Sequence, residues 1–152
     1  MSVAVWWIRR DMRLADNKAV QGAASRGAVA PLFVVDPVFA DAGIARRNYM
    51  FTTLRDLDLR MNRCLILRHG RPVDAVVEFA QSVGARSVHI AADFTPYGQR
   101  RDAAVRSALQ SAGIELVVDD SPYVVNPGTV VKDDGTPLKV FTPFFKRWLQ
   151  VP

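Results

Sequence analysis

The chain has 152 residues, of which 49% are hydrophobic and 23% charged, a balance typical of one globular domain and not of a disordered chain. The formal net charge of +5 is weak evidence for a nucleic-acid surface, because the arginines are spread along the chain. The single cysteine, Cys64, excludes an intramolecular disulfide, and no stretch approaches the roughly 20 apolar residues of a membrane span, so we expect a soluble, cytoplasmic protein without membrane association.

Apolar runs alternate with helical patterns along most of the chain. The runs that predict strands lie at residues 3–8, 28–36, 64–68, 87–93 and 114–119. The patterns between them predict helices over residues 17–25 and 46–61, from Pro72 to about residue 80, and over residues 99–111. Strands that are apolar throughout must be covered on both faces. The expected fold is therefore α/β, a doubly wound five-stranded parallel sheet of Rossmann-like type.

Individual residues sharpen these expectations. Asp16 or Asn17 is expected to cap the first helix, and Gly27 to end it. Cys64 opens an apolar run and is predicted to be a buried small side chain, and His89, inside a strand, a satisfied structural residue. The helix over 46–61 is predicted to present one apolar face, formed by Tyr49, Met50, Leu54, Leu57 and Met61.

The pattern changes after Asp119. Asp134-Gly135 is a type I′ turn signal between short β-prone stretches, and Pro143 is expected in the first turn of a short helix. We divide the chain into an α/β domain, residues 1–128, and an extended or hairpin segment with a short helix, residues 129–152. An aromatic cluster near the end is expected to pack against another part of the protein; it comprises Phe141, Phe144, Phe145 and Trp148.

Several kinds of chemistry are excluded. The loop over residues 9–17 has no glycine, so neither a dinucleotide fingerprint nor a P-loop follows the first strand, although arginines could hold a phosphate there. Cys64, His69 and His89 lack metal-ligand spacing, and no nucleophile elbow is present. A self-sufficient catalytic site is not expected.

A crevice remains as the candidate site. In a doubly wound sheet, ligands bind at the carboxyl ends of the strands where the strand order reverses. The loops expected there are residues 9–11, 36–37 and 92–95, which combine apolar faces with a few charges and suit a planar ligand. For Asp11, the alternative to a role at the crevice is a salt bridge to a neighbouring residue.

Four stretches, "WWIRRDMRLADN", "LFVVDPVF", "DFTPYGQRRD" and "VFTPFFKRW", together resemble the amino-terminal domain of the DNA photolyase and cryptochrome family. The resemblance runs from residue 3 to about residue 149. It implies a domain that holds a light-harvesting antenna chromophore, followed in the family by a larger helical domain that carries FAD and the lesion pocket. There, the excited antenna passes energy to reduced FAD, which donates an electron to a pyrimidine dimer in damaged DNA. This chain alone is predicted to be inactive in repair.

The resemblance also implies a ligand and its contacts. A deazaflavin is favoured, and a methenyl folate or flavin mononucleotide (FMN) stays open, because "DFTPYGQRRD" is similar to the deazaflavin branch while the folate branch's Asn-Glu pair is missing near Tyr97. Asp93 would accept a hydrogen bond from a ring nitrogen, Val35 and Asp36 would line the ring, and Arg46 would face its polar edge. Thr95 stands where that branch tends to carry an acid. Arg10 would close the crevice, so Arg10→Ala is expected to weaken chromophore binding, and Asp11→Ala to disturb packing against the helical domain.

Other readings stay open. A cryptochrome photoreceptor is one alternative, since the difference between a cryptochrome and a photolyase lies in the helical domain. An adenine-nucleotide module of stress-protein or electron-transfer-flavoprotein type would use the same crevice but usually has a glycine-rich loop. A docking unit that dimerises through Phe144, Phe145 and Trp148 would need no ligand.

Overall fold

The computed structural model describes residues 2–152 and contains two compact units, one through Pro122 and one over Tyr123–Pro152, which are described separately. The two units meet at 122/123, and the domain boundary predicted from the sequence at 128/129 stays a prediction. Across residues 2–152, no helix is both long and apolar enough to cross a membrane.

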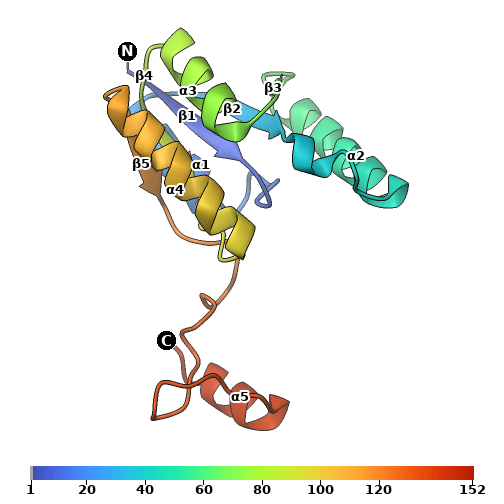
Figure 1. Cartoon of the computed structure of the whole chain (residues 1–152), viewed down its shortest axis with the longest axis vertical. Helices are drawn as coiled ribbons and strands as arrows, with labels where there is room; N and C mark the ends of the chain where they lie inside the picture. The colour runs from blue at the N-terminus through green and yellow to red at the C-terminus, as the bar shows by residue number, and fades with distance from the viewer. Residues whose placement is uncertain (1) are drawn as a thin grey trace. The chain divides into compact units, whose positions relative to one another are not determined.

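The first unit is built on a five-stranded parallel sheet, as predicted. Its strands are β1 (Val3–Ile8), β2 (Ala28–Val35), β3 (Ile66–His69), β4 (Ala85–Ile90) and β5 (Glu115–Val118). They lie in the order β3-β2-β1-β4-β5, with β1 in the centre (Figure 1). The strand order reverses between β1 and β4, so the carboxyl ends of these two strands flank the expected crevice.

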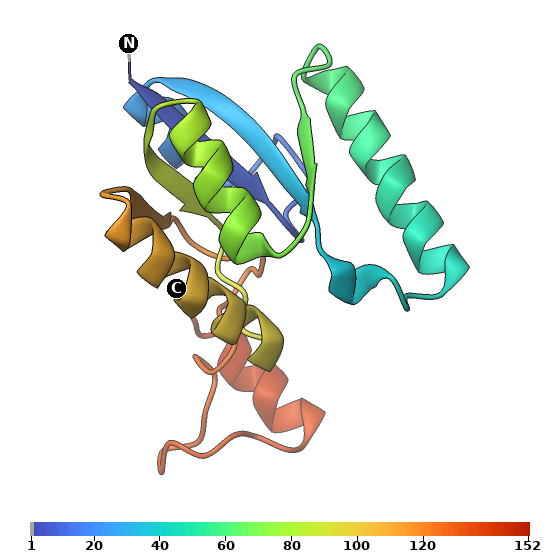
Figure 2. The ribbon, with the colours of Figure 1, turned by 45° about the horizontal axis from the view of Figure 1, so that its top comes forward.

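Helices cover both faces of this sheet. They are α1 (Lys18–Arg26), α2 (Ile44–Arg60), α3 (Pro72–Ser82) and α4 (Pro96–Ser111). Figures 1 and 2 show α3 and α4 side by side on one face and α1 on the other. Val5 and Trp7 pack with residues of α3 and α4, while Trp6 and Ile8 pack with residues of α1 and α2. This two-sided burial explains why β1 is apolar at every position.

Helix α1 begins and ends where its sequence predicts. The Asn17 side chain accepts hydrogen bonds from the backbone N–H groups of Ala19 and Val20 and so caps two free donors. Gly27 follows the helix with φ 140°, a value that side chains rarely adopt, and a Cβ there would lie 2.2 Å from the carbonyl oxygen of Ser2. Both predictions are confirmed.

The predictions around β3 are wrong in detail. The strand begins at Ile66, not at residue 64, and lies at the edge of the sheet, where Leu67 is 42% exposed. Cys64 is exposed, not buried, because it follows a turn in which Asn62 and Arg63 both have positive φ. On α2, Leu54 and Leu57 are buried as expected, but Tyr49 is 72% exposed and does not share their face.

Two further boundaries differ from prediction. Helix α4 starts at Pro96, three residues before position 99, because the Thr95 hydroxyl accepts a hydrogen bond from the Gly98 N–H and caps the helix early. Strand β4 covers residues 85–90 and not 87–93, so residues 91–95 form a loop beyond its carboxyl end.

Three polar side chains, of which Ser87 and His89 are buried and Asp119 is half-buried, connect β4 to the residue that follows β5. The His89 ring lies 3.1 Å from the Ser87 hydroxyl and 2.8 Å from an Asp119 carboxylate oxygen, so its structural role is confirmed. Gly22 of α1 packs over this trio, and a Cβ there would lie 2.0 Å from Asp119 Oδ1. The glycine therefore permits close approach of the helix to the sheet.

In the second unit, α5 (Phe141–Trp148) starts two residues before Pro143 and carries stacked rings, with Phe141 and Phe145 5.6 Å apart between centroids. The predicted type I′ turn is wrong, because Gly135 has positive φ (79°) and Asp134 does not. Gly135 N–H donates to Lys132 O and Lys132 N–H to Thr136 O, so the turn is one residue longer. Val131 and Pro137 form an isolated antiparallel β-bridge across this turn.

Candidate functional site

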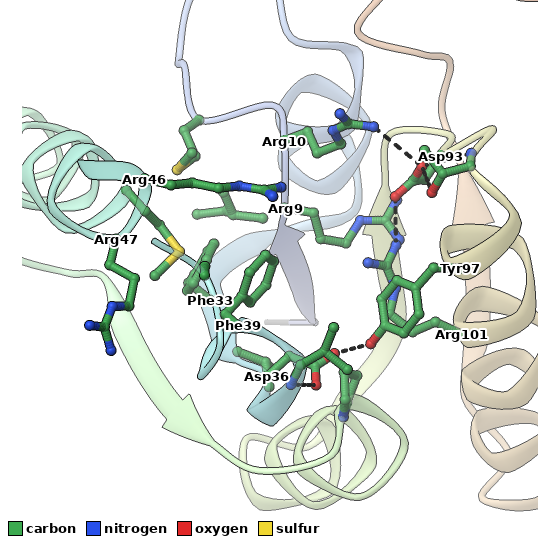
Figure 3. Close-up of a pocket in the computed structure, with 18 of the residues that line it drawn as sticks. Arg9, Arg10, Phe33, Asp36, Phe39, Arg46, Arg47, Asp93, Tyr97 and Arg101 are labelled. Atoms are coloured by element: carbon green, nitrogen blue, oxygen red, sulfur yellow. Dashed lines mark hydrogen bonds and ion pairs between the residues drawn. The ribbon is translucent and has the colours of Figure 1, made fainter. Parts of the chain in front are cut away.

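A cavity of about 670 Å³ opens at the carboxyl ends of β1, β2 and β4, where the sequence places the crevice (Figure 3). Its apolar walls come mainly from Trp7, Phe33, Phe39 and Met50. Its charged and polar lining includes Arg9, Arg10, Asp36, Asp41, Arg46, Arg47, Asp93, Thr95, Tyr97 and Arg101. An apolar slot with a few polar groups is the usual form of a small-molecule site.

Five of the six residues expected from the sequence line this cavity, namely Arg10, Asp36, Arg46, Asp93 and Thr95. Val35 does not, and Val34 lines it instead. The sequence reasoning did not single out Tyr97 and Arg101, which project from the first turns of α4. Both belong to the quoted stretch "DFTPYGQRRD", and their four-residue spacing on a helix was the available signal.

Asp93 is occupied by contacts within its own loop. Its Oδ1 accepts hydrogen bonds from the Thr95 N–H (3.1 Å) and hydroxyl (2.8 Å), and its Oδ2 from Arg101 Nη2 (3.3 Å). Arg10, half-exposed, adds an ion pair at 3.8 Å. Burial alone would raise the pKa of this carboxyl, but the Thr95 bonds and the two guanidinium groups outweigh it and lower the pKa. Asp93 is therefore ionised and orders the start of α4.

Asp36 faces the cavity from the end of β2. It is buried, and its Oδ1 caps the short helix Pro37–Phe39 by accepting from the Val38 N–H at 3.1 Å. The Tyr97 hydroxyl donates to the other oxygen across the cavity floor (Figure 3). Burial, together with this bond and the Asp36 charge, raises the pKa of Tyr97 to about 12, so the phenol stays protonated at neutral pH.

Two guanidinium groups lie on the indole ring of Trp7. Arg9 lies 4.8 Å and Arg101 5.2 Å from the ring centroid, and both bond to Asp102 Oδ1, Arg9 at 2.7 Å and Arg101 at 2.8 Å. Arg9 also donates to the Ala91 carbonyl. Burial lowers the Arg9 pKa, an effect that Asp102 opposes. This cluster fixes the loops after β1 and β4 to α4, so the cavity wall is preorganised.

Arg46 and Arg47 line the cavity from the first turn of α2. Gly43 caps this helix without a side-chain hydrogen bond, and the first turn contains no acid. Basic residues at a helix N-terminus oppose the macrodipole at a cost of about 0.3–1 kcal/mol each. Arg46 has no ion pair in the described chain and points toward the middle of the cavity (Figure 3). This placement suits an anionic part of a ligand.

Asp11 is bonded within its own loop. It is 3% exposed and accepts hydrogen bonds from Trp6 Nε1 (3.2 Å), Arg9 N (3.0 Å) and Asn17 Nδ2 (3.2 Å). These bonds fold the glycine-free loop onto itself. The expectation that Asp11→Ala disturbs packing against the helical domain stays a prediction, because that domain lies outside residues 2–152. A buried carboxylate with three internal donors is a structural residue.

The sequence profile of the DNA photolyase family matches residues 4–152 of the chain. The chain belongs to this family. A deoxyribodipyrimidine photo-lyase from Streptomyces griseus is 39% identical over 97% of the chain and 34% of its own length, so the chain spans about a third of that relative.

Two photolyase crystal structures share the fold, each at 23% identity. The class III enzyme from Agrobacterium tumefaciens gives a TM-score of 0.89 over 99% of the chain and 32% of its own. The archaeal enzyme from Sulfolobus tokodaii is described with two FAD molecules and a novel light-harvesting cofactor. It gives a TM-score of 0.83 over 98% of the chain and 35% of its own length. Together with the sheet order, they establish the photolyase amino-terminal α/β fold.

Proposed function

We propose that the unit through Pro122 binds a light-harvesting chromophore of the flavin or deazaflavin class, as part of a longer photolyase that repairs pyrimidine dimers in DNA. The cavity at the carboxyl ends of β1, β2 and β4 carries this proposal. Its volume of about 670 Å³ suits a ligand the size of a tricyclic ring system with a side chain.

The cavity walls fit a planar aromatic ligand. Phe33 and Phe39 present apolar surface on the β2 side, Met50 does so from α2, and Trp7 lies at the end of β1. A thioether adapts its shape to a ring face, and aromatic side chains stack or meet it edge-on. Because Arg9 and Arg101 hold Trp7 and the adjoining loops, the slot is preorganised and binding pays little ordering entropy.

Charge supports a ligand with an anionic part. Arg10 and Arg101 are paired with Asp93, whereas Arg46 has no acidic partner in the described chain. An anion in the cavity would therefore pair with Arg46 and also meet the positive end of α2. A phosphate on FMN or the ionised ring oxygen of a deazaflavin would supply this charge.

The bound chromophore would supply absorption of light and transfer of its energy to a second, redox-active flavin. The residues of this chain bind and orient it and exclude water from its faces. The Sulfolobus tokodaii photolyase, with its two FAD molecules, is a solved relative in which a flavin is linked to light harvesting. In the longer protein, the helical FAD domain and damaged DNA are the proposed partners.

Absorption and fluorescence-polarisation titrations of the purified chain test the proposal, with FMN, a deazaflavin, a methenyl folate and ATP added separately. We expect saturable one-to-one binding of FMN or the deazaflavin with a shifted absorption band. Binding of ATP alone would instead assign the adenine-nucleotide class, and saturable binding of the folate alone would refute the flavin-class ligand.

Two arginines of α2 provide a matched pair. Arg46→Ala is expected to weaken binding of the anionic ligand by about 1 kcal/mol, a factor of roughly five, as for a partly exposed ion pair. Arg55→Ala removes the same charge from an exposed position of the same helix outside the cavity lining and should leave affinity unchanged. Equal losses in both variants would indicate only a general effect of net charge.

A further inference from the structure

We infer that Asp36, oriented by Tyr97, accepts the hydrogen bond from a ring N–H of the chromophore, and that Asp93 serves to order its own loop. The inference rests on the proposed function and names the part of the ligand that the site selects. The group recognised is the imide N–H of a flavin-type ring, the nitrogen flanked by two carbonyl groups.

The acceptor capacity of Asp93 is largely used inside the protein. A carboxylate has about four lone-pair positions. Two are taken by Thr95 and one by Arg101, and Arg10 lies 3.8 Å from Oδ1. A ring nitrogen would have to displace a charge-assisted contact or the helix-capping turn of Thr95. Such a displacement costs more than a new neutral donor returns.

Asp36 has the opposite balance. Each of its oxygens accepts one hydrogen bond, from the Val38 N–H and from the Tyr97 hydroxyl, so about two lone-pair positions stay open. It is 6% exposed and has no ion pair in the described chain. A buried carboxylate with two neutral donors is under-compensated, and an added donor is worth more there than at Asp93.

The position of Asp36 makes this donor a ligand atom. The carboxylate lines the cavity at the end of β2, on the side away from Arg46 (Figure 3). Tyr97 reaches it from α4 and fixes the plane of the carboxylate by its own hydrogen bond. A ligand with an anionic part near Arg46 therefore presents its other end to Asp36. In flavins and deazaflavins, the imide lies at one end of the ring system and can meet this requirement.

The test compares FMN with N3-methyl-FMN, in which a methyl group replaces the imide hydrogen and leaves the rest of the ring intact. The unmodified chain is expected to bind FMN about 10- to 100-fold more tightly, the range for a hydrogen bond to a charged acceptor. Asp36→Asn should reduce this ratio to near one, because the amide keeps one oxygen for the Val38 N–H and turns a donor toward the ligand.

Two variants complete the design. Asp93→Asn should weaken binding of both ligands alike and keep their ratio, as expected of a residue that orders a loop. Asp74→Asn removes the same charge at an exposed position on α3 outside the cavity. It should change neither the affinity for FMN nor the affinity for N3-methyl-FMN. Because the ratio is measured on one protein sample, partial unfolding of a variant cancels.

Each result decides a different statement. Binding of FMN and N3-methyl-FMN with equal affinity by the unmodified chain overturns the inference and leaves the proposed function standing. A ratio lost in Asp93→Asn and kept in Asp36→Asn returns the role to Asp93. Failure of the unmodified chain to bind either flavin, or the deazaflavin, overturns the proposed function and the inference with it.

Discussion

Replacing Gly98 with alanine tests how tightly Asp93 is built into α4. Gly98 lies in the first turn of the helix, and a Cβ there would come within 2.2 Å of the Asp93 carboxyl carbon and 2.5 Å of its Oδ2. Real Cβ atoms do not approach so closely, so the carboxylate must move. It is held from three directions, by Thr95, Arg101 and Arg10. The substitution therefore breaks contacts although it adds one methyl group.

Two opposing effects set the magnitude. Glycine to alanine in a helix gains up to about 1 kcal/mol from backbone entropy. Displacing Asp93 forfeits two hydrogen bonds from Thr95 to a charged acceptor, worth about 1.5–3 kcal/mol each. The difference is a loss of about 2–5 kcal/mol in the free energy of unfolding. Helix propensity alone predicts the opposite sign, which makes the measurement decisive.

Urea unfolding followed by circular dichroism measures this change, with the slope checked for constancy between variants. The matched background is Asp93→Ala, in which the obstacle is gone and Gly98→Ala should be neutral or stabilising by up to about 1 kcal/mol. If Gly98→Ala raises stability in the unmodified background too, the carboxylate is not held where the structure places it, and the argument for its internal role fails.

Three further predictions concern stability. Asp11→Ala leaves two buried donors, Trp6 Nε1 and the Arg9 N–H, without an acceptor, while Asn17 Nδ2 keeps the Asp11 and Arg13 carbonyl oxygens; it should cost the isolated chain about 2–4 kcal/mol in urea unfolding. Gly22→Ala should destabilise although it favours the helix, because its Cβ would lie 2.0 Å from Asp119 Oδ1; Asp119→Ala should relieve this cost. Because the pKa of Tyr97 is raised to about 12, its protonated form stabilises the fold below pH 10, and this contribution is lost as the pH rises toward 12. The stability difference between the chain and its Tyr97→Phe variant should therefore shrink over that interval, as measured by urea unfolding at each pH.

The sequence predicts best where a local pattern and the tertiary environment agree. In β1, every position from Ala4 to Ile8 is buried, so the apolar run is a direct record of two-sided packing. Asn17 and Gly27 carry backbone signals that act within a few residues. These features need no knowledge of distant parts of the chain, and they fixed the alternation of strand and helix from which the sheet was predicted.

Prediction fails where the deciding interaction is distant or the environment is mixed. Cys64 stands at the head of an apolar run, but the run belongs to an edge strand with one open side, and a turn with two left-handed residues exposes the cysteine. Asp36 and Tyr97 meet across 61 positions of sequence, which no local pattern encodes. Five of the six residues expected at the crevice line the cavity, but the partners that decide what each can still bind came only from the fold.

Two features of the cavity lower the stability of the protein when no ligand is bound. Arg46 and Arg47 stand in the first turn of α2, which contains no acid, and Asp36 is a buried carboxylate that makes no ion pair within residues 2–152. The opposite charges do not pair with each other, because they lie on different sides of the cavity (Figure 3). Local rules of stability are broken most often at functional sites. A ligand that places an anion near Arg46 and a donor near Asp36 removes both costs at once, and a ring with an anionic end and an imide end has that polarity.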